Sequence, residues 1–210
     1  MLVNKTSLIL RGPQANVPAC GRLGTSNEAV IRQANGPVQL VADGVTLEGF
    51  TIQGGVSGLS AGITTSANAA GYRLLNNIIQ NNAQGVYLSS NGTTQTLVQG
   101  NSFRHDPAAG ARAINGIYAD VGLRNATIAQ NCFAGQGNAS IVISGSVERD
   151  PEKFSGLSIT NNTATGEQFL ELLFTKNVTI RGNRVTNAPP SADPQVQGVA
   201  ISLGGGNVSV

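Results

Sequence analysis

Six segments of the chain share one pattern of apolar and polar positions: residues 45–52, 72–79, 96–103, 126–133, 157–164 and 178–185. In each segment the third and eighth residues are apolar. Apolar first and third positions around a polar second position are typical of a β-strand with one buried face. The fifth residue is Gly or Asn in five of the six segments, and these residue types tolerate a positive φ best. Each segment therefore predicts two short strands joined by a tight bend.

The sixth position is asparagine in five of the six segments, at Asn77, Asn101, Asn131, Asn162 and Asn183. Counted from Phe50 in the first segment, successive sixth positions are 27, 24, 30, 31 and 21 residues apart, a period that indicates a solenoid. An asparagine that points inward at such a bend is buried and needs hydrogen-bond partners. Stacked identical asparagines supply them to one another, as amide ladders do in cross-β stacks. We therefore expect these five residues to form a structural ladder.

A third strand is expected after each bend, at residues 62–65, 85–88, 116–119, 140–144, 169–174 and 198–203. Three short strands per repeat predict an all-β fold, a parallel β-helix of roughly seven coils and about 35 Å in length at about 4.8 Å per coil. We expect one domain over residues 1–210. It begins inside a coil and ends at the start of another, so we expect a fragment truncated at both ends, with further domains of the same chain beyond them.

Composition excludes several other classes of protein. Charged residues make up only 11% of the chain, 27 of the 210 residues are Gly, and the formal net charge is +2. Abundant Gly and Asn are unfavourable in helices, which excludes a helical bundle. The 13 basic and 11 acidic residues are too evenly balanced for a nucleic-acid binder. We therefore expect no nucleic-acid binding. No apolar stretch approaches the length of a transmembrane helix, so we also expect no membrane insertion.

The two cysteines, Cys20 and Cys132, are far apart in the sequence. They lack the CxxC spacing and the neighbouring histidines of a zinc site, so we expect no metal and no cofactor. In the predicted solenoid they are at least three coils apart, whereas a disulfide requires Cα atoms within about 7 Å. We therefore expect two free thiols.

The repeats YRLLNNII, TLVQGNSF, ATIAQNCF, LSITNNTA and VTIRGNRV resemble the right-handed parallel β-helix repeat of the pectate-lyase-like superfamily. The opening VNKTSLILRG and the later VTLEGFTI are similar to the first coils of many bacterial members. The resemblance implies right-handed coils, an extracellular or cell-envelope location, and a polysaccharide or oligosaccharide as the ligand. It supplies no catalytic residues, because the Asp-Asp, Gly-His-Gly and Arg-Ile-Lys motifs of the polygalacturonases are missing from the chain.

One outward face of the predicted solenoid carries candidate binding chemistry. Strand alternation places Tyr87 and Tyr118 outward on adjacent coils, with Asp120 beside Tyr118 and Glu171 roughly 10 Å from Tyr118. Aromatic faces suit sugar rings, and two carboxyl groups about 6.5–9.5 Å apart suit inverting glycoside hydrolysis. Tyr87 and Tyr118 are therefore candidates for substrate binding, and Asp120 and Glu171 are candidates for catalysis.

Three long insertions, residues 104–115, 145–156 and 186–197, are expected to wall this face. The first contains His105 and Asp106, and a histidine beside an aspartate can act as a general base. A solvated turn at Asp106 and Pro107 is the more common explanation of the same residues. We include His105 and Asp106 among the candidate substrate-binding residues.

Three functions remain open at this point. The first is an extracellular domain that presents a carbohydrate-binding face. The second is a polysaccharide-degrading enzyme, a glycoside hydrolase or lyase that uses Asp120 and Glu171. The third is a structural spacer or adhesin domain of a surface protein. An acid pair at hydrolase separation favours the second function, and a featureless groove favours the third.

Overall fold

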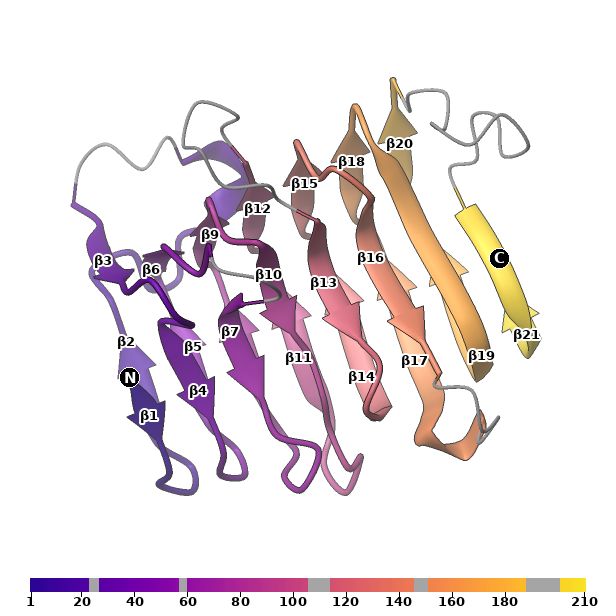
Figure 1. Ribbon diagram of the computed structural model, residues 1–210, viewed down its shortest axis with the longest axis horizontal. Coiled ribbons are helices and arrows are strands. Elements are labelled where there is room, and N and C mark those ends of the chain that lie inside the picture. Colours follow the sequence, from indigo (N-terminus) through magenta and orange to yellow (C-terminus); the bar gives the residue numbers. More distant parts are fainter. Residues whose placement is uncertain (23–26, 57–59, 106–113, 146–150, 188–200) are drawn as a thin grey trace.

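The computed structural model describes residues 1–22, 27–56, 60–105, 114–145, 151–187 and 201–210. They form a parallel β-helix whose coils follow one another along a single axis (Figure 1). The strands on the near side of Figure 1 run downward and those on the far side run upward while the coils advance from left to right, so the helix is right-handed. The predicted fold class is confirmed.

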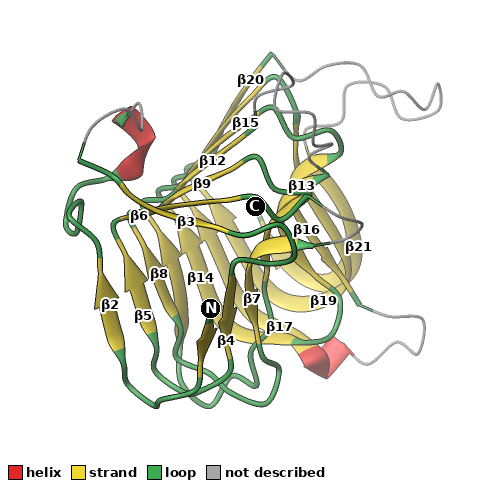
Figure 2. Cartoon of the chain, turned by 60° about the vertical axis from the view of Figure 1, so that its left-hand side comes forward, coloured by secondary structure: helices red, strands yellow, loops and turns green. Residues whose placement is uncertain are grey.

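Each coil contributes one strand to each of three faces, and every strand pair is parallel (Figure 2). The first, called here the β10 face, contains β1 (Leu2–Val3), β4 (Val38–Leu40), β7 (Ala61–Thr65), β10 (Gln84–Tyr87), β13 (Asn115–Ala119), β16 (Ala139–Ser144) and the start of β19 (Gln168–Arg181). The β11 face contains β2 (Ile9–Arg11), β5 (Thr46–Glu48), β8 (Arg73–Leu75), β11 (Thr96–Gln99), β14 (Leu123–Ala129), β17 (Phe154–Thr160) and the end of β19. The β12 face contains β3 (Ala29–Arg32), β6 (Phe50–Gln53), β9 (Ile78–Gln80), β12 (Ser102–Arg104), β15 (Cys132–Ala134), β18 (Thr163–Thr165) and β20 (Arg184–Thr186).

The last described strand, β21 (Ile201–Ser209), pairs with both halves of β19. It contains the end of the third strand expected at residues 198–203, of which residues 198–200 lie outside the described part of the chain. In the described part of the chain, the 3-10 turns Ala19–Gly21 and Pro151–Lys153 lie outside the sheets.

The sequence repeat coincides with the stacking of the strands. The third residues of the six segments are in register along the β11 face and are buried: Leu47, Leu74, Val98, Ile128, Ile159 and Ile180. The eighth residues are in register along the β12 face. Among these, the rings of Phe103 and Phe133 stack with centroids 4.7 Å apart. Each coil therefore covers the apolar residues of the coil before it, and the core runs the length of the solenoid.

The bend between the β11 face and the β12 face has the positive φ that the residue types at the fifth positions predict. All six of these residues have positive φ, from 54° at Asn76 to 75° at Gly49, and they include Gln130 at 55°. This left-handed conformation is tolerated best by Gly and Asn. It turns the chain from the β11 face into the β12 face within one residue, and the sixth residue then points inward.

The asparagines at the sixth positions form a continuous hydrogen-bonded column. The Asn131 Oδ1 atom accepts from the backbone N–H of Asn101 at 2.9 Å and from its Nδ2 at 3.0 Å. The Asn131 Nδ2 donates to the Val98 carbonyl oxygen at 2.9 Å and to the Asn162 Oδ1 at 3.0 Å. The same arrangement repeats from Asn77 to Asn183. The column therefore pairs backbone groups that the bend would otherwise leave buried and unpaired.

Replacing Asn131 with alanine is expected to lower the free energy of unfolding by about 1–3 kcal/mol, because it leaves buried donors of Asn101 and the Val98 carbonyl without partners. Asn183→Ala is the matched comparison. Asn183 is half-buried, so water can replace part of what its side chain provides, and a smaller loss is expected. Urea unfolding of both variants measures the difference, and equal, negligible losses would contradict a stabilising column.

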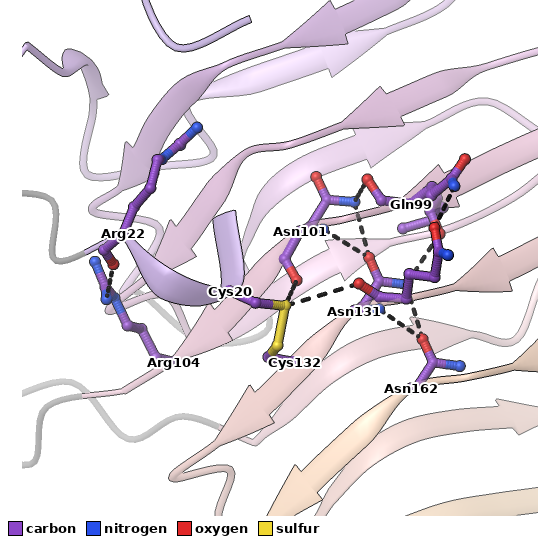
Figure 3. Close-up of a disulfide and its surroundings, with 10 residues drawn as sticks. Cys20, Arg22, Gln99, Asn101, Arg104, Asn131, Cys132 and Asn162 are labelled. Carbon is purple, nitrogen blue, oxygen red and sulfur yellow. Dashed lines mark hydrogen bonds between the residues drawn. A yellow bond between two sulfur atoms is a disulfide. The ribbon is translucent and has the colours of Figure 1, made fainter. Parts of the chain in front are cut away.

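Cys20 and Cys132 form a disulfide with Cα atoms 5.6 Å apart, so the expectation of two free thiols was wrong. Cys132 points away from the core, as its place between Asn131 and Phe133 predicts. The error lies in the position of Cys20. Residues 12–22 leave their own coil and lie across the bends of later coils, where the Ala19 N–H donates to the Gly100 carbonyl oxygen at 2.8 Å (Figure 3). This path brings Cys20 next to Cys132, although the sequence predicts that the two residues are at least three coils apart along the solenoid axis.

This crossing segment, residues 12–22, has further anchors on the solenoid. The Asn16 N–H donates to Glu48 Oε1 at 2.9 Å, and Glu48 also accepts from Asn76 Nδ2 and pairs with Arg11, each at 3.2 Å. Glu48 is 3% exposed. Burial acts to raise the pKa of its carboxyl group, but these hydrogen bonds outweigh burial and hold that pKa below its ordinary value. At the end of the crossing segment, the Arg22 carbonyl oxygen accepts a hydrogen bond from Arg104 Nη1 at 2.9 Å.

Candidate functional site

Tyr87 and Tyr118 lie together on the outer surface of the β10 face. They occupy paired positions on the adjacent strands β10 and β13. Their ring centroids are 5.8 Å apart, with 26° between the ring planes. The strand alternation that buries Val86 and Ile117 turns both rings outward. The two rings therefore cover part of each other, and the pair presents its remaining faces and edges from rigid strands.

Asp120 follows β13 directly and holds both tyrosines. The Tyr87 hydroxyl donates to Asp120 Oδ1, and the Tyr118 hydroxyl donates to Oδ2 at 3.2 Å. Partial burial and the neighbouring carboxylate raise the pKa of both phenols, that of Tyr87 strongly. Both phenols are therefore neutral hydrogen-bond donors at neutral pH, and their donation fixes the orientation of the carboxylate.

The tyrosines and Asp120 line an open groove with a volume of about 330 Å³. It extends across β13, β10 and β7 to β4 and is lined by Asn35, Gly36, Gln39, Ser60, Ala61, Thr64, Gln84, Tyr87, Tyr118 and Asp120. Gln84, at the start of β10, is 2% exposed, and no hydrogen bond to its Oε1 is found among the described residues. The groove thus combines two aromatic rings and a carboxylate.

Glu171 shares the outward row of the tyrosines but does not line the groove. Val142 lies between Tyr118 and Glu171 in the strand register. Relative to Asp120, Glu171 is displaced by about 10 Å across the strands and about 7 Å along them. Its negative charge contributes to the raised pKa of Tyr118. The structure therefore brings together Tyr87, Tyr118 and Asp120, and it leaves Glu171 beside the groove.

His105 lies at the end of β12 and is not part of the groove. Its backbone N–H donates to the Ala134 carbonyl oxygen at 3.2 Å. Its Nδ1 is buried, with no hydrogen-bond partner in the described part of the chain. Asp106 lies outside the described residues, as do the rest of residues 106–113 and residues 146–150 and 188–197 of the insertions expected to wall the face. No group of three or more His, Cys, Asp or Glu side chains that could hold a metal is found among the residues that the structure describes.

Two features of this region were not found from the sequence. Gln39 and Thr64 continue the row of the tyrosines on β4 and β7, and aligning residues 38–40 with the later third strands would have revealed them. Glu167 is the second feature, a carboxyl group only 1% exposed, which accepts from the Ser140 hydroxyl and from the Gln136 N–H at 2.8 Å. Burial raises its pKa to about 7. No sequence pattern marks a buried acid that precedes a strand.

Comparisons of the chain with protein-family models, with curated proteins and with solved structures found no match in any of the three. In the described part of the chain, no helix has the length and apolar character needed to cross a bilayer. The geometry and chemistry of the groove therefore carry the functional inference.

Proposed function

We propose that this protein is an extracellular or cell-envelope β-helix domain that binds a polysaccharide in the groove of the β10 face. The observation that carries the proposal is the pair of stacked tyrosines whose hydroxyls both donate to Asp120. Aromatic rings provide large, rigid apolar surface at low cost in conformational entropy. A sugar ring can pack its apolar face on such a surface while its hydroxyls bond to polar groups at the edge.

The polar lining of the groove matches the hydroxyl groups of a sugar. The Asp120 carboxylate is an acceptor, and Gln39 and Thr64 offer further donors and acceptors. The groove crosses successive strands along the solenoid axis, which suits a linear chain of sugar units. A concave surface with a few directed polar groups is the usual form of a binding site.

Two observations support the location and the ligand class. The disulfide between Cys20 and Cys132 favours an oxidising compartment, because such bonds form and persist mainly outside the cytosol. The repeats resemble those of the pectate-lyase-like superfamily, whose bacterial members suggest a polysaccharide ligand and an extracellular or cell-envelope location.

A polysaccharide-degrading enzyme is the second candidate, favoured by the presence of Asp120 and Glu171 on one face. Inverting hydrolysis requires carboxyl groups about 6.5–9.5 Å apart, whereas the strand register places the backbones of these two residues about 12 Å apart. This separation makes the enzyme the weaker of the two candidates. Asp120→Asn separates the two functions, since it would abolish turnover in a hydrolase and leave much of the affinity of a binding domain. If no glycan binds and no polysaccharide is degraded, a structural spacer or adhesin domain becomes the preferred account.

Tyr118→Ala is expected to weaken the binding of any glycan identified on an array by about 5- to 30-fold, or about 1–2 kcal/mol, because one stacking surface is lost. Tyr118→Phe is the matched control, since it keeps the ring and removes only the hydroxyl bond to Asp120, and it should retain most of the affinity. Arg73→Ala, on the β11 face, should bind as the wild type does. Calorimetric titration measures all three, and unchanged binding by Tyr118→Ala would rule out this groove as the site.

A further inference from the structure

The groove offers acceptors to a ligand and carries negative charge. The Asp120 carboxylate lies between the two tyrosine hydroxyls. Glu171 lies on the same outward row, close enough for its charge to act on Tyr118. Of the described residues that line the groove, none is Lys or Arg. An anionic ligand would therefore meet like charge, with no cation among the described lining residues.

We propose that the groove selects uncharged, hydroxyl-rich glycans and rejects those built of uronic acids. This inference rests on the proposed glycan-binding function and specifies its substrate class. It differs from the acidic ligands that the names of polygalacturonases and pectate lyases suggest. Selection arises from repulsion by Asp120 and Glu171, while the tyrosines hold sugar rings of either class.

Matched pairs of oligosaccharides test this inference on the full chain. Each pair consists of a neutral gluco-, galacto- or manno-oligosaccharide and the same oligosaccharide oxidised at C6 to the uronate. The two members therefore differ only in charge and in one hydroxyl group per sugar. At about 10 mM salt, the neutral member of any pair that binds is expected to have an affinity at least about 10-fold higher than that of its uronate. At about 1 M salt, where the screening length falls to about 3 Å, the difference should narrow to about 3-fold.

Asp120→Asn and Glu171→Gln remove the two charges and keep the shape of the side chains. Each is expected to reduce the preference for the neutral member at low salt, mainly by improving uronate binding. A uronate that binds as tightly as its neutral partner, or more tightly, at low salt would overturn this inference and leave the glycan-binding function standing. Binding of neither member in every pair would overturn both.

Discussion

Removing the disulfide, by replacing Cys20 and Cys132 with serine, is expected to lower the free energy of unfolding by about 3–5 kcal/mol. The bond joins residues 112 positions apart, and the constraint that a cross-link places on the unfolded chain grows with the length of the loop it closes. In the folded protein it fastens residues 12–22 across the bends of later coils, where the Ala19 N–H already pairs with Gly100. Both effects act in the same direction.

Urea unfolding of the double variant measures this loss. Wild-type protein unfolded in a thiol reductant is the control and should show the same midpoint as the double variant. Each single variant should lose about as much as the double variant, because either substitution opens the same bond. A loss below about 1 kcal/mol would contradict the stabilising role of the disulfide. Alkylation of two thiols in the unreduced protein would contradict the presence of the disulfide.

The stability of the protein is expected to fall by an amount on the order of 3 kcal/mol as the pH rises from about 4.5 to about 7, because of Glu167. Burial raises the pKa of this carboxyl group from an ordinary value of 4.5 to about 7 in the folded protein. Below pH 4.5 the group is protonated in both the folded and the unfolded protein. Between the two values the unfolded chain ionises while the folded chain stays neutral, which favours unfolding.

Glu167→Gln is the matched variant, since its neutral amide can still accept from the Gln136 N–H. Its free energy of unfolding should lack this decline between pH 4.5 and 7. Glu48 has a lowered pKa in the folded protein. Its contribution to the free energy of unfolding is therefore lost only as the pH falls below 4.5, outside this window. Unfolding curves of the wild type and Glu167→Gln with parallel pH dependence would show that Glu167 does not titrate as described.

The regular part of the fold could be predicted because one repeat encodes it. The apolar third and eighth positions stack directly on one another, and the bend needs a positive φ that Gly and Asn accept. The segment that carries Cys20 has no repeat, and its path depends on contacts such as that of Asn16 with Glu48, which are distant in sequence. A pattern of local alternation contains no information about such a crossing.

The same distinction applies to the candidate site. Tyr87 and Tyr118 could be placed on one face because outward positions follow from strand alternation and register. That both hydroxyls meet on Asp120 depends on the chain path after β13. The burial of Gln84 depends on the packing of neighbouring coils. The sequence could identify the outward row, but not which acids on it enter the groove.

The central claim is that the groove formed by Tyr87, Tyr118 and Asp120 is a glycan-binding site. A crystal structure of the protein soaked with the neutral oligosaccharide that binds most tightly tests it most directly. The account predicts a sugar ring stacked on one of the two tyrosines, with a hydroxyl group about 3 Å from the Asp120 carboxylate. A sugar bound on the β11 or β12 face with this groove empty, or no glycan that binds at all, would contradict it.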